Sequence, residues 1–435
     1  MGLFQRLRRA APPPSPRPGP SAPAGAVVTP AQLHRLIPCN RLSEAELASW
    51  SGQCQRLTLP AATEVFRQGE GDGSGFYLLK GEVTLDYGDK SRVLGSTATP
   101  GYPLACGRRY AATAITRTAA EIVRVPAELM TLGLQRQRPV AIEAACVSDD
   151  FSHLPPPLRQ SEVFYTFWRH YRGNHLDFPP LPQVAIRLRR AIRQEIGVRE
   201  AARIVQSDPV VSARLIEIAN SPLYRGASPI TSCQQAINRI GLNATRNLVT
   251  SLTLGRLFKA ANPRVERWLT RIWQENVRVS SFSYVLARHL RDIDAEQALL
   301  AGLLSHVGAL PFLYFAADFP ADRLSDEVVA AAIAAVRGPL GQALLRAWDF
   351  PPAFCEVPRH CEDWYYDDSG PLTLSDVVTL ATWHVQLGRR QPLPPIETLP
   401  SFQKLDLREI SPAFSLGLLH NAREHLAQIR TLLQL

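Results

Sequence analysis

The stretch that most constrains the fold of this chain is 207–251, where short helical segments are separated by strong start and stop signals. Asp208 followed by Pro209 predicts a helix start, because aspartate caps free backbone N–H groups and proline is tolerated at the first helical position. Ser232 and Gln235 have the spacing of a capping box for the next helix. Apolar residues at helical spacing between these signals predict helices packed around a common core.

The same helical pattern continues through the second half of the chain. Gly241 is expected to end one helix, and Asn243 is expected to cap the next. We assign residues 176–370 to a helical bundle and residues 371–435 to C-terminal helices packed on it. The last of these helices, FSLGLLHNAREHLAQIRTLLQL, has apolar residues at alternating spacings of three and four. That stripe suits packing on the bundle or a short homodimer seam.

Strand periodicity dominates the first third of the chain. Residues 31–135 contain short alternating segments bounded by glycine turns, which predict a small β-barrel or jelly roll. The proline-rich leader, 1–30, cannot bury a core and is expected to be disordered. Residues 136–175 read as a connector that contains an aromatic helix, VFYTFWRHYRG, suited to packing at a domain junction. The fold class is therefore multidomain α+β, with a barrel followed by an all-α bundle.

Composition narrows the setting of the protein. Seven scattered cysteines without a Cys-x-x-Cys pair argue against a disulfide framework and a zinc site, and favour the cytoplasm. The net charge of +9 is spread over 435 residues, which is too mild to indicate a nucleic-acid binder. The most apolar window, Ala298–Phe315, is interrupted by Ser305, His306 and Pro311. We therefore expect buried core there and no membrane span, which needs about 20 apolar residues.

Four motifs in the helical half occur in one order. They are FPPLPQVA (178–185), DPVVSARLIEIANS (208–221), AINRIGL (236–242) and NLV (247–249). Together they resemble the HDOD domain, a helical relative of the HD phosphohydrolases found in bacterial signalling proteins. The resemblance runs from about Phe178 to about Asp363, and it implies an all-α, HDOD-like bundle.

The resemblance also implies where a metal site would stand in catalytic relatives. HD enzymes use a His, a His-Asp pair and further ligands to hold divalent metals that activate water against a phosphate. Here Ser305 and His306 occupy the positions of the His-Asp pair, and a hydroxyl is a poor replacement for an imidazole. We expect no catalytic residue, no metal and no cofactor. The remnants from which a metal site could still be built are His306, His360 and Glu275.

In the first third, FRQGEGDGSGFYLLKGEVTL (66–85) resembles the cyclic-nucleotide-binding domain. That resemblance implies a phosphate cassette within residues 100–118, where backbone amides, a Glu and an Arg would hold the nucleotide. The Glu is absent, and Tyr110 takes the place of the Arg unless the alignment shifts by one residue. The residues that could still bind a phosphate are Gly101, Arg108, Arg109, Ala112 and Thr113. A structural barrel without nucleotide is expected, and a changed ligand is the alternative.

These observations lead to one functional hypothesis and two alternatives. The hypothesis is a non-catalytic bacterial signalling protein, with a degenerate nucleotide-sensor-like barrel and an HDOD output domain that contacts other signalling proteins. The first alternative is a regulator gated by a cyclic nucleotide or dinucleotide. The second is an atypical HD-class metal-dependent phosphohydrolase. The partner, the pathway and the oligomeric state do not follow from the sequence.

Overall fold

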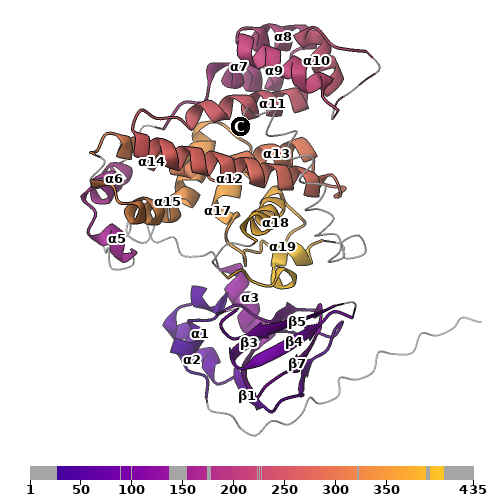
Figure 1. Cartoon of the computed structure of the whole chain (residues 1–435), viewed down its shortest axis with the longest axis vertical. Helices are drawn as coiled ribbons and strands as arrows, with labels where there is room; N and C mark the ends of the chain where they lie inside the picture. The colour runs from indigo at the N-terminus through magenta and orange to yellow at the C-terminus, as the bar shows by residue number, and fades with distance from the viewer. Residues whose placement is uncertain are drawn as a thin grey trace, which may run out of the picture.

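The computed structural model describes residues 27–88, 90–98, 100–136, 154–173, 178–222, 224, 226, 228–320, 323–387 and 392–405. Within these residues a β-rich N-terminal domain lies at one end of an elongated molecule, and helices build the rest (Figure 1). The expected α+β architecture is confirmed. The leader up to residue 26, most of the connector and the expected terminal helix lie outside the described residues.

The N-terminal domain contains two four-stranded antiparallel sheets. The first has the order β1 (Gln55–Leu59), β8 (Ala120–Val125), β3 (Gly73–Lys80), β6 (Ala105–Gly107), and the second β2 (Glu64–Phe66), β7 (Thr113–Thr116), β4 (Glu82–Asp86), β5 (Ser91–Gly95). Four helical segments accompany them: α1 (Pro30–Leu33), η1 (Cys39–Arg41), α2 (Glu44–Ser51) and α3 (Ala127–Gln135). Inward-facing residues such as Phe66, Phe76 and Leu85 form a core between the strands. The two sheets therefore pack around an apolar interior, as expected for a small barrel or jelly roll.

The helical part is divided between two hydrophobic cores. The smaller core joins α7 (Gln183–Arg193), α8 (Val198–Gln206), α9 (Pro209–Asn220), α10 (Cys233–Ile240) and α11 (Leu242–Leu254). The larger core involves α5 (Pro156–Arg159), α6 (Glu162–Arg172), η3 (Gly255–Leu257), α12 (Pro263–Ala287), α13 (Ala295–Leu304), η4 (Val307–Ala309), α14 (Leu310–Ala317), α15 (Asp326–Ala347), α16 (Pro352–Cys355), α17 (Val357–His360) and α18 (Leu374–Gln386). The short η6 (Ile396–Thr398) and α19 (Pro400–Gln403) follow. Figure 1 places α7–α10 at the end opposite to the barrel.

The helix signals of 207–251 are confirmed in part. The Asp208 carboxylate accepts a hydrogen bond from the backbone N–H three residues on, at 3.1 Å. Ser232 caps α10 in the same way, but Gln235 accepts from the residue before Ser232, so the capping box is incomplete. The prediction that Asn243 caps α11 is wrong. Gly241, with a φ of +88°, ends α10 and also begins α11, so Asn243 lies within the helix.

Among the residues that the structure describes, two segments are long and apolar enough to span a membrane by length and composition alone. They are Ala295–Ala317 and Asp326–Ala347, with mean hydropathies of 1.7 and 1.6. The window Ala298–Phe315, for which a buried core position was expected, lies inside the first of them. In the folded chain 89% of the first window and 50% of the second are buried. The first segment therefore takes the core position expected for it.

The aromatic helix predicted in the connector is α6, and its rings pack into the larger helical core. The ring of Phe167 on α6 lies 5.1 Å from that of Phe312 and 5.4 Å from that of Phe315 on α14, both edge-on. Such edge-to-face pairs are favoured over stacked sandwiches. α6 thus anchors the end of the connector to the larger helical core.

The barrel is joined to the helical part by a buried ion pair. Arg41 of η1 lies 2.5 Å from Asp363, and the two side chains are only 3% and 7% exposed. Arg41 also donates a 2.9 Å hydrogen bond to the carbonyl oxygen of Tyr365. The ring of Tyr102, from the barrel, stacks on the Tyr365 ring at 6.1 Å. Because these groups come from both the barrel and the helical part, the junction between the two is held by charge as well as by ring contact.

A buried histidine on α18 makes the stability dependent on pH. His384 Nδ1 donates a 2.7 Å hydrogen bond to the carbonyl oxygen of Leu380, and its ring stacks on Phe282. Burial lowers the pKa of His384, so the folded protein binds its proton less tightly than the unfolded chain does. The contribution of His384 to stability is therefore present above the unfolded pKa of about 6.5 and is lost as the pH falls below it.

We expect the free energy of unfolding to fall between pH 7 and pH 5, with His384 contributing at most about 1.4 kcal/mol per pH unit. A His384→Gln variant should show a shallower dependence, because the amide does not titrate. Urea unfolding at several pH values measures the slope. The matched control is His34→Gln, since His34 is exposed, and this variant should keep the wild-type slope. Equal slopes in the wild type and His384→Gln would contradict the assignment.

Candidate functional site

The candidate site lies where α13 ends against α12 and α15. Gly302 allows α13 to touch α12, because a Cβ at this position would overlap the backbone of Ser280. Gly308 has the same role toward α15, where a Cβ would overlap the carbonyl oxygen of Arg337. These two close approaches fix Ser305 and His306, which lie between the glycines and are 0% and 4% exposed.

His306 is the centre of a buried polar network. Its Nδ1 lies 2.9 Å from Asn276 Oδ1 and 2.9 Å from Ser305 Oγ. Its Nε2 lies 3.2 Å from an oxygen of Glu362. The Ser305 hydroxyl also donates a 2.8 Å hydrogen bond to the Gly302 carbonyl. Both ring nitrogens of His306 thus face oxygen atoms of neighbouring side chains.

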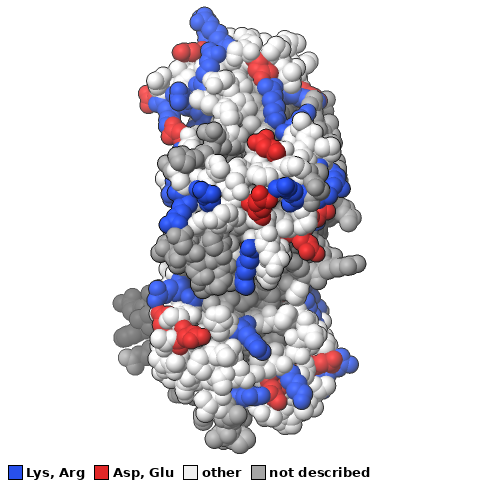
Figure 2. Space-filling model, turned by 90° about the vertical axis from the view of Figure 1, so that its left-hand side faces the viewer, with Lys and Arg blue, Asp and Glu red and all other residues white. Residues whose placement is uncertain are grey.

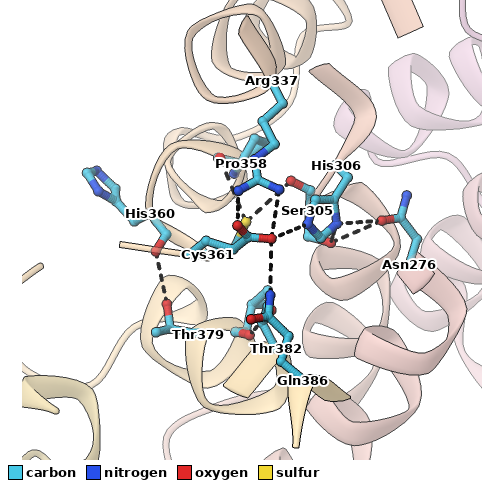
Figure 3. A network of polar contacts seen from close by, with 12 residues as sticks. Asn276, Ser305, His306, Arg337, Pro358, His360, Cys361, Thr379, Thr382 and Gln386 are labelled. Atoms are coloured by element: carbon cyan, nitrogen blue, oxygen red, sulfur yellow. Dashed lines mark hydrogen bonds and ion pairs between the residues drawn. The ribbon is translucent and has the colours of Figure 1, made fainter. Parts of the chain in front are cut away.

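The carboxylate of Glu362 is held by a guanidinium. Arg337 of α15 donates a 2.7 Å hydrogen bond to one oxygen and pairs with the second oxygen through its other terminal nitrogen. Gln386 of α18 donates a further 3.3 Å hydrogen bond. Figure 3 shows Arg337, His306 and Gln386 converging on one point from three sides. A bidentate pair of this kind combines a charge interaction with fixed geometry.

Three side chains of the site could offer ligand atoms to a divalent metal. Glu275, His306 and Glu362 each offer one ligand atom, and these atoms lie within 4.8 Å of one another. Carboxylates and imidazole are suitable ligands for several divalent cations. However, both Glu362 oxygens are directed at Arg337, whose positive charge lies beside the place that a metal would take. The arrangement therefore does not fit a metal unless Arg337 moves away.

Of the three remnants named from the sequence, the structure brings two together. Glu275 and His306 share the cluster, and Glu362 stands where His360 was expected. His360 points away from the cluster in Figure 3, and its ring stacks on Tyr366 at 3.5 Å. Burial, followed by the charges of two arginines, lowers the pKa of His360 to about 3. His360 is therefore neutral near pH 7 and lies outside the site.

Sequence reasoning missed Glu362 and Arg337. Glu362 lies two residues beyond His360, the position that the resemblance drew attention to. Arg337 is the only charged residue within the apolar segment 328–345 of α15. A lone charge in an otherwise apolar helical segment signals a charged partner, because an unpaired charge is costly where the segment packs. The single charge of Arg337 within this apolar segment is the signal in the sequence from which its role could be predicted.

The cassette residues of the barrel do not gather into an anion site. Tyr110 is buried, and its hydroxyl donates a 2.9 Å hydrogen bond to Asp72 while its ring packs on Phe66. Arg108 and Arg109 are exposed on the preceding turn. An aromatic ring therefore fills the interior position, and the two arginines lie outside it.

The other three candidate residues have structural positions. Gly101 has a φ of +75° and lies against the backbone of Arg35. Thr113 begins β7, and its hydroxyl accepts a 3.0 Å hydrogen bond from the backbone of Gln68. Ala112 lines a small cavity of the barrel.

Solved structures that are similar to this chain cover mainly its helical half. The "putative metal-dependent phosphohydrolase" of Shewanella amazonensis SB2B is similar over 63% of this chain and 100% of its own, with 25% identity and a TM-score of 0.54. An HDOD domain protein of unknown function from Geobacter sulfurreducens covers 62% of this chain and 98% of its own, with 19% identity and a TM-score of 0.46. In the N-terminal third, a cyclic-nucleotide-binding-like protein from Brucella abortus covers 21% of this chain and 85% of its own, with 22% identity and a TM-score of 0.18.

Comparison by sequence identifies the family of the helical domain. An uncharacterized protein of Treponema pallidum (strain Nichols) is 25% identical over 142 residues, which cover 31% of this chain and about a quarter (26%) of that protein. The HDOD domain family matches residues 178–363. This span agrees with the limits expected from the four motifs. Residues 178–363 therefore form an HDOD domain.

Proposed function

We propose that this chain is a non-catalytic signal-transduction protein whose HDOD domain acts through contact with other signalling proteins. The observation that supports this proposal is the pairing of Arg337 with both oxygens of Glu362. A guanidinium balances negative charge, but it cannot coordinate water and lower the pKa of that water as a divalent metal does. A metal-dependent phosphohydrolase would activate water with a metal at this site. Here the guanidinium of Arg337 lies beside the place that such a metal would take.

Ser305 supports the same proposal. Its hydroxyl donates to a backbone carbonyl and lies beside His306, so its lone hydrogen already has a structural partner. A neutral hydroxyl is also a weaker metal ligand than imidazole. In this proposal the network of Ser305, His306 and Asn276 fixes the packing of α12 against α13 and performs no chemistry. The barrel would serve as a sensor or scaffold in the cytoplasm.

The charge distribution favours a protein partner over nucleic acid. On the face shown in Figure 2, basic and acidic side chains are interspersed among the described residues. A nucleic-acid surface would be expected to show a basic stripe or patch. At the α7–α11 end, Val210 is 57% exposed beside the helix start of α9. We place the partner contact at this end and use Val210, an apolar side chain exposed there, to test it.

Metal analysis and turnover together test the non-catalytic part of the proposal. We expect full-length protein to contain far less than one divalent metal ion per chain. Hydrolysis of cyclic dinucleotides and nucleotides should not exceed that of a His306→Ala variant. The proposal would be overturned by one tightly held metal per chain that is lost in His306→Ala together with turnover.

The proposed contact with other signalling proteins needs a separate experiment. Cross-linking of the full chain to captured partners should be weakened by Val210→Glu. It should be unaffected by Val93→Glu, a matched change at a residue that is 44% exposed on the barrel. If both variants behave alike, the contact does not involve the α7–α11 end.

Metal-dependent phosphohydrolysis is the second candidate function, and two findings favour it. Glu275, His306 and Glu362 lie close enough to share a cation, and a structural relative carries the phosphohydrolase description. For this candidate Arg337 would have to swing out when metal enters. The same metal analysis distinguishes the two candidates, because only the enzyme requires a stoichiometric divalent ion.

A further inference from the structure

Positive charge gathers at the seam between the two helical cores. Four arginines form this cluster: Arg189, Arg190 and Arg193 of α7 and Arg246 of α11. α11 packs against α7, as Figure 1 shows. The chain that meets them is the connection between α15 and α16, which contains Asp349 and Phe350. Because Phe350 belongs to the larger core and α7 mainly to the smaller one, the cluster lies where the two cores meet.

Two guanidinium groups of the cluster converge on one backbone oxygen. Arg189 and Arg193 donate hydrogen bonds of 2.9 and 2.6 Å to the carbonyl oxygen of Asp349. Arg189 is only 6% exposed, and its guanidinium carbon lies 3.6 Å from the centre of the Phe350 ring. A cation over an aromatic face is attracted to the ring. Arg189 is therefore a fixed positive charge at the base of the cluster.

The positive charge of the cluster is only partly balanced. The Asp349 carboxylate lies 2.5 Å from Arg193, and its side chain is 65% exposed. A second carboxylate whose charge reaches the cluster, that of Asp294, caps α13 and accepts a backbone hydrogen bond at 2.8 Å. Four guanidinium groups thus face two carboxylates. Burial, and then the charges of neighbouring arginines, lowers the pKa of Arg189 to about 10 and also lowers that of Arg246.

Arg246 has donors to offer to a ligand. A guanidinium carries five N–H groups. Among the residues that the structure describes, the Arg246 side chain makes one hydrogen bond, from Nε to the adjacent Asn247 at 3.3 Å. Its two terminal nitrogens are therefore available to oxygen atoms from outside the chain. Arg190 and Arg193 are exposed, so the cluster is accessible from solvent.

We propose that this cluster binds a phosphate-bearing anion, which Arg246 and Arg193 hold against the fixed charge of Arg189. Planar guanidinium groups match the oxygens of a phosphate and bind them in a bidentate manner. A phosphate has enough terminal oxygens to serve several guanidinium groups, whereas the two oxygens of a carboxylate are satisfied by one. The Asp349 carboxylate competes with the anion for Arg193. The site shares no residue with the polar network around His306, so it does not depend on whether the HDOD domain is catalytic.

Calorimetric titration of the full chain with pyrophosphate, at constant ionic strength, tests the site. We expect saturable binding to the wild type. Arg246→Gln should weaken binding about tenfold, because a hydrogen bond between two charged groups is lost. Asp349→Asn should strengthen binding about threefold, because the charge that competes for the exposed Arg193 is removed. Asparagine tolerates the φ of +59° at this position, so the backbone is preserved.

Two substitutions on α8 are the matched controls for charge. Arg203→Gln and Glu200→Gln change exposed side chains by the same charges and should leave the affinity unchanged. The proposal is overturned if pyrophosphate does not bind the wild type, or if Arg203→Gln weakens binding as much as Arg246→Gln does. It is also overturned if Asp349→Asn strengthens binding no more than Glu200→Gln does. Urea unfolding verifies that each variant is folded.

A second titration identifies the source of the phosphate group. A short phosphoserine peptide carries this group as part of a protein, and its unphosphorylated form is the control. Tighter binding of pyrophosphate than of the peptide indicates a small-molecule ligand, and the reverse order indicates a phosphorylated partner. If Arg246→Gln weakens the binding of neither probe, the arginine cluster is not the site.

Discussion

Arg337→Met should destabilise the protein by about 3 kcal/mol, and Mn²⁺ or Zn²⁺ should restore part of the loss. The substitution keeps an apolar stem on α15 but leaves the Glu362 carboxylate, which is 22% exposed, without its guanidinium. Removing one partner of a largely buried pair exposes the full desolvation cost of the other charge. With Arg337 gone, Glu275, His306 and Glu362 become available to one cation. Binding of a metal to the folded state alone then raises stability.

The measurement is the urea midpoint with and without divalent metal. The wild type should not respond to metal, because Arg337 already occupies the position. Arg323→Met is the matched control: its 2.7 Å pair with Glu162 is more than half exposed, so its loss should cost less than about 1 kcal/mol. A wild-type midpoint that rises with metal as much as that of Arg337→Met would show that the guanidinium does not exclude the ion.

Asp363→Asn should cost about 3–5 kcal/mol and should loosen the junction between the barrel and the helical part. The amide preserves the shape of the side chain but leaves the Arg41 guanidinium, only 3% exposed, facing a neutral group. Because Arg41 belongs to η1 and Asp363 follows α17, the loss falls on the contact between domains. Urea unfolding measures the cost, and X-ray scattering in solution measures the increase in the radius of gyration.

Glu46→Gln is the control for this prediction. Its pair with Arg136 lies within the N-terminal domain, at 2.6 Å, and the two side chains are 32% and 58% exposed. Its loss should leave both the urea midpoint and the radius of gyration close to those of the wild type. A radius of gyration that stays constant in Asp363→Asn would mean that apolar contacts alone hold the junction.

Local signals in the sequence were reliable where the structure depends on neighbouring residues. Asp208 caps α9 because its carboxylate needs only the next three residues to find a partner. Asn243 failed as a cap because Gly241 could adopt a positive φ and serve two helices at once. Strand alternation similarly predicted the barrel, since the face of a strand that is buried repeats every second residue.

The candidate site depends on contacts that local patterns do not encode. Arg337 and Glu362 are 25 residues apart, and their pairing depends on how α15 crosses η4 over Gly308. His306 was named from the motif, but its neighbours Asn276 and Glu362 come from other helices. Which of two nearby residues, His360 or Glu362, faces His306 is decided by the orientation of the short α17. No periodicity over four residues determines such an orientation.

The ion pair between Arg41 and Asp363 has a consequence for the order of folding. Its two residues are 322 positions apart, and almost the whole HDOD domain lies between them. A contact across such a distance forms late, because the entropy of closing the loop is lost before the contact repays it. An N-terminal domain that folds first therefore folds without the Asp363 contact, and it gains that contact only when the helical part is complete.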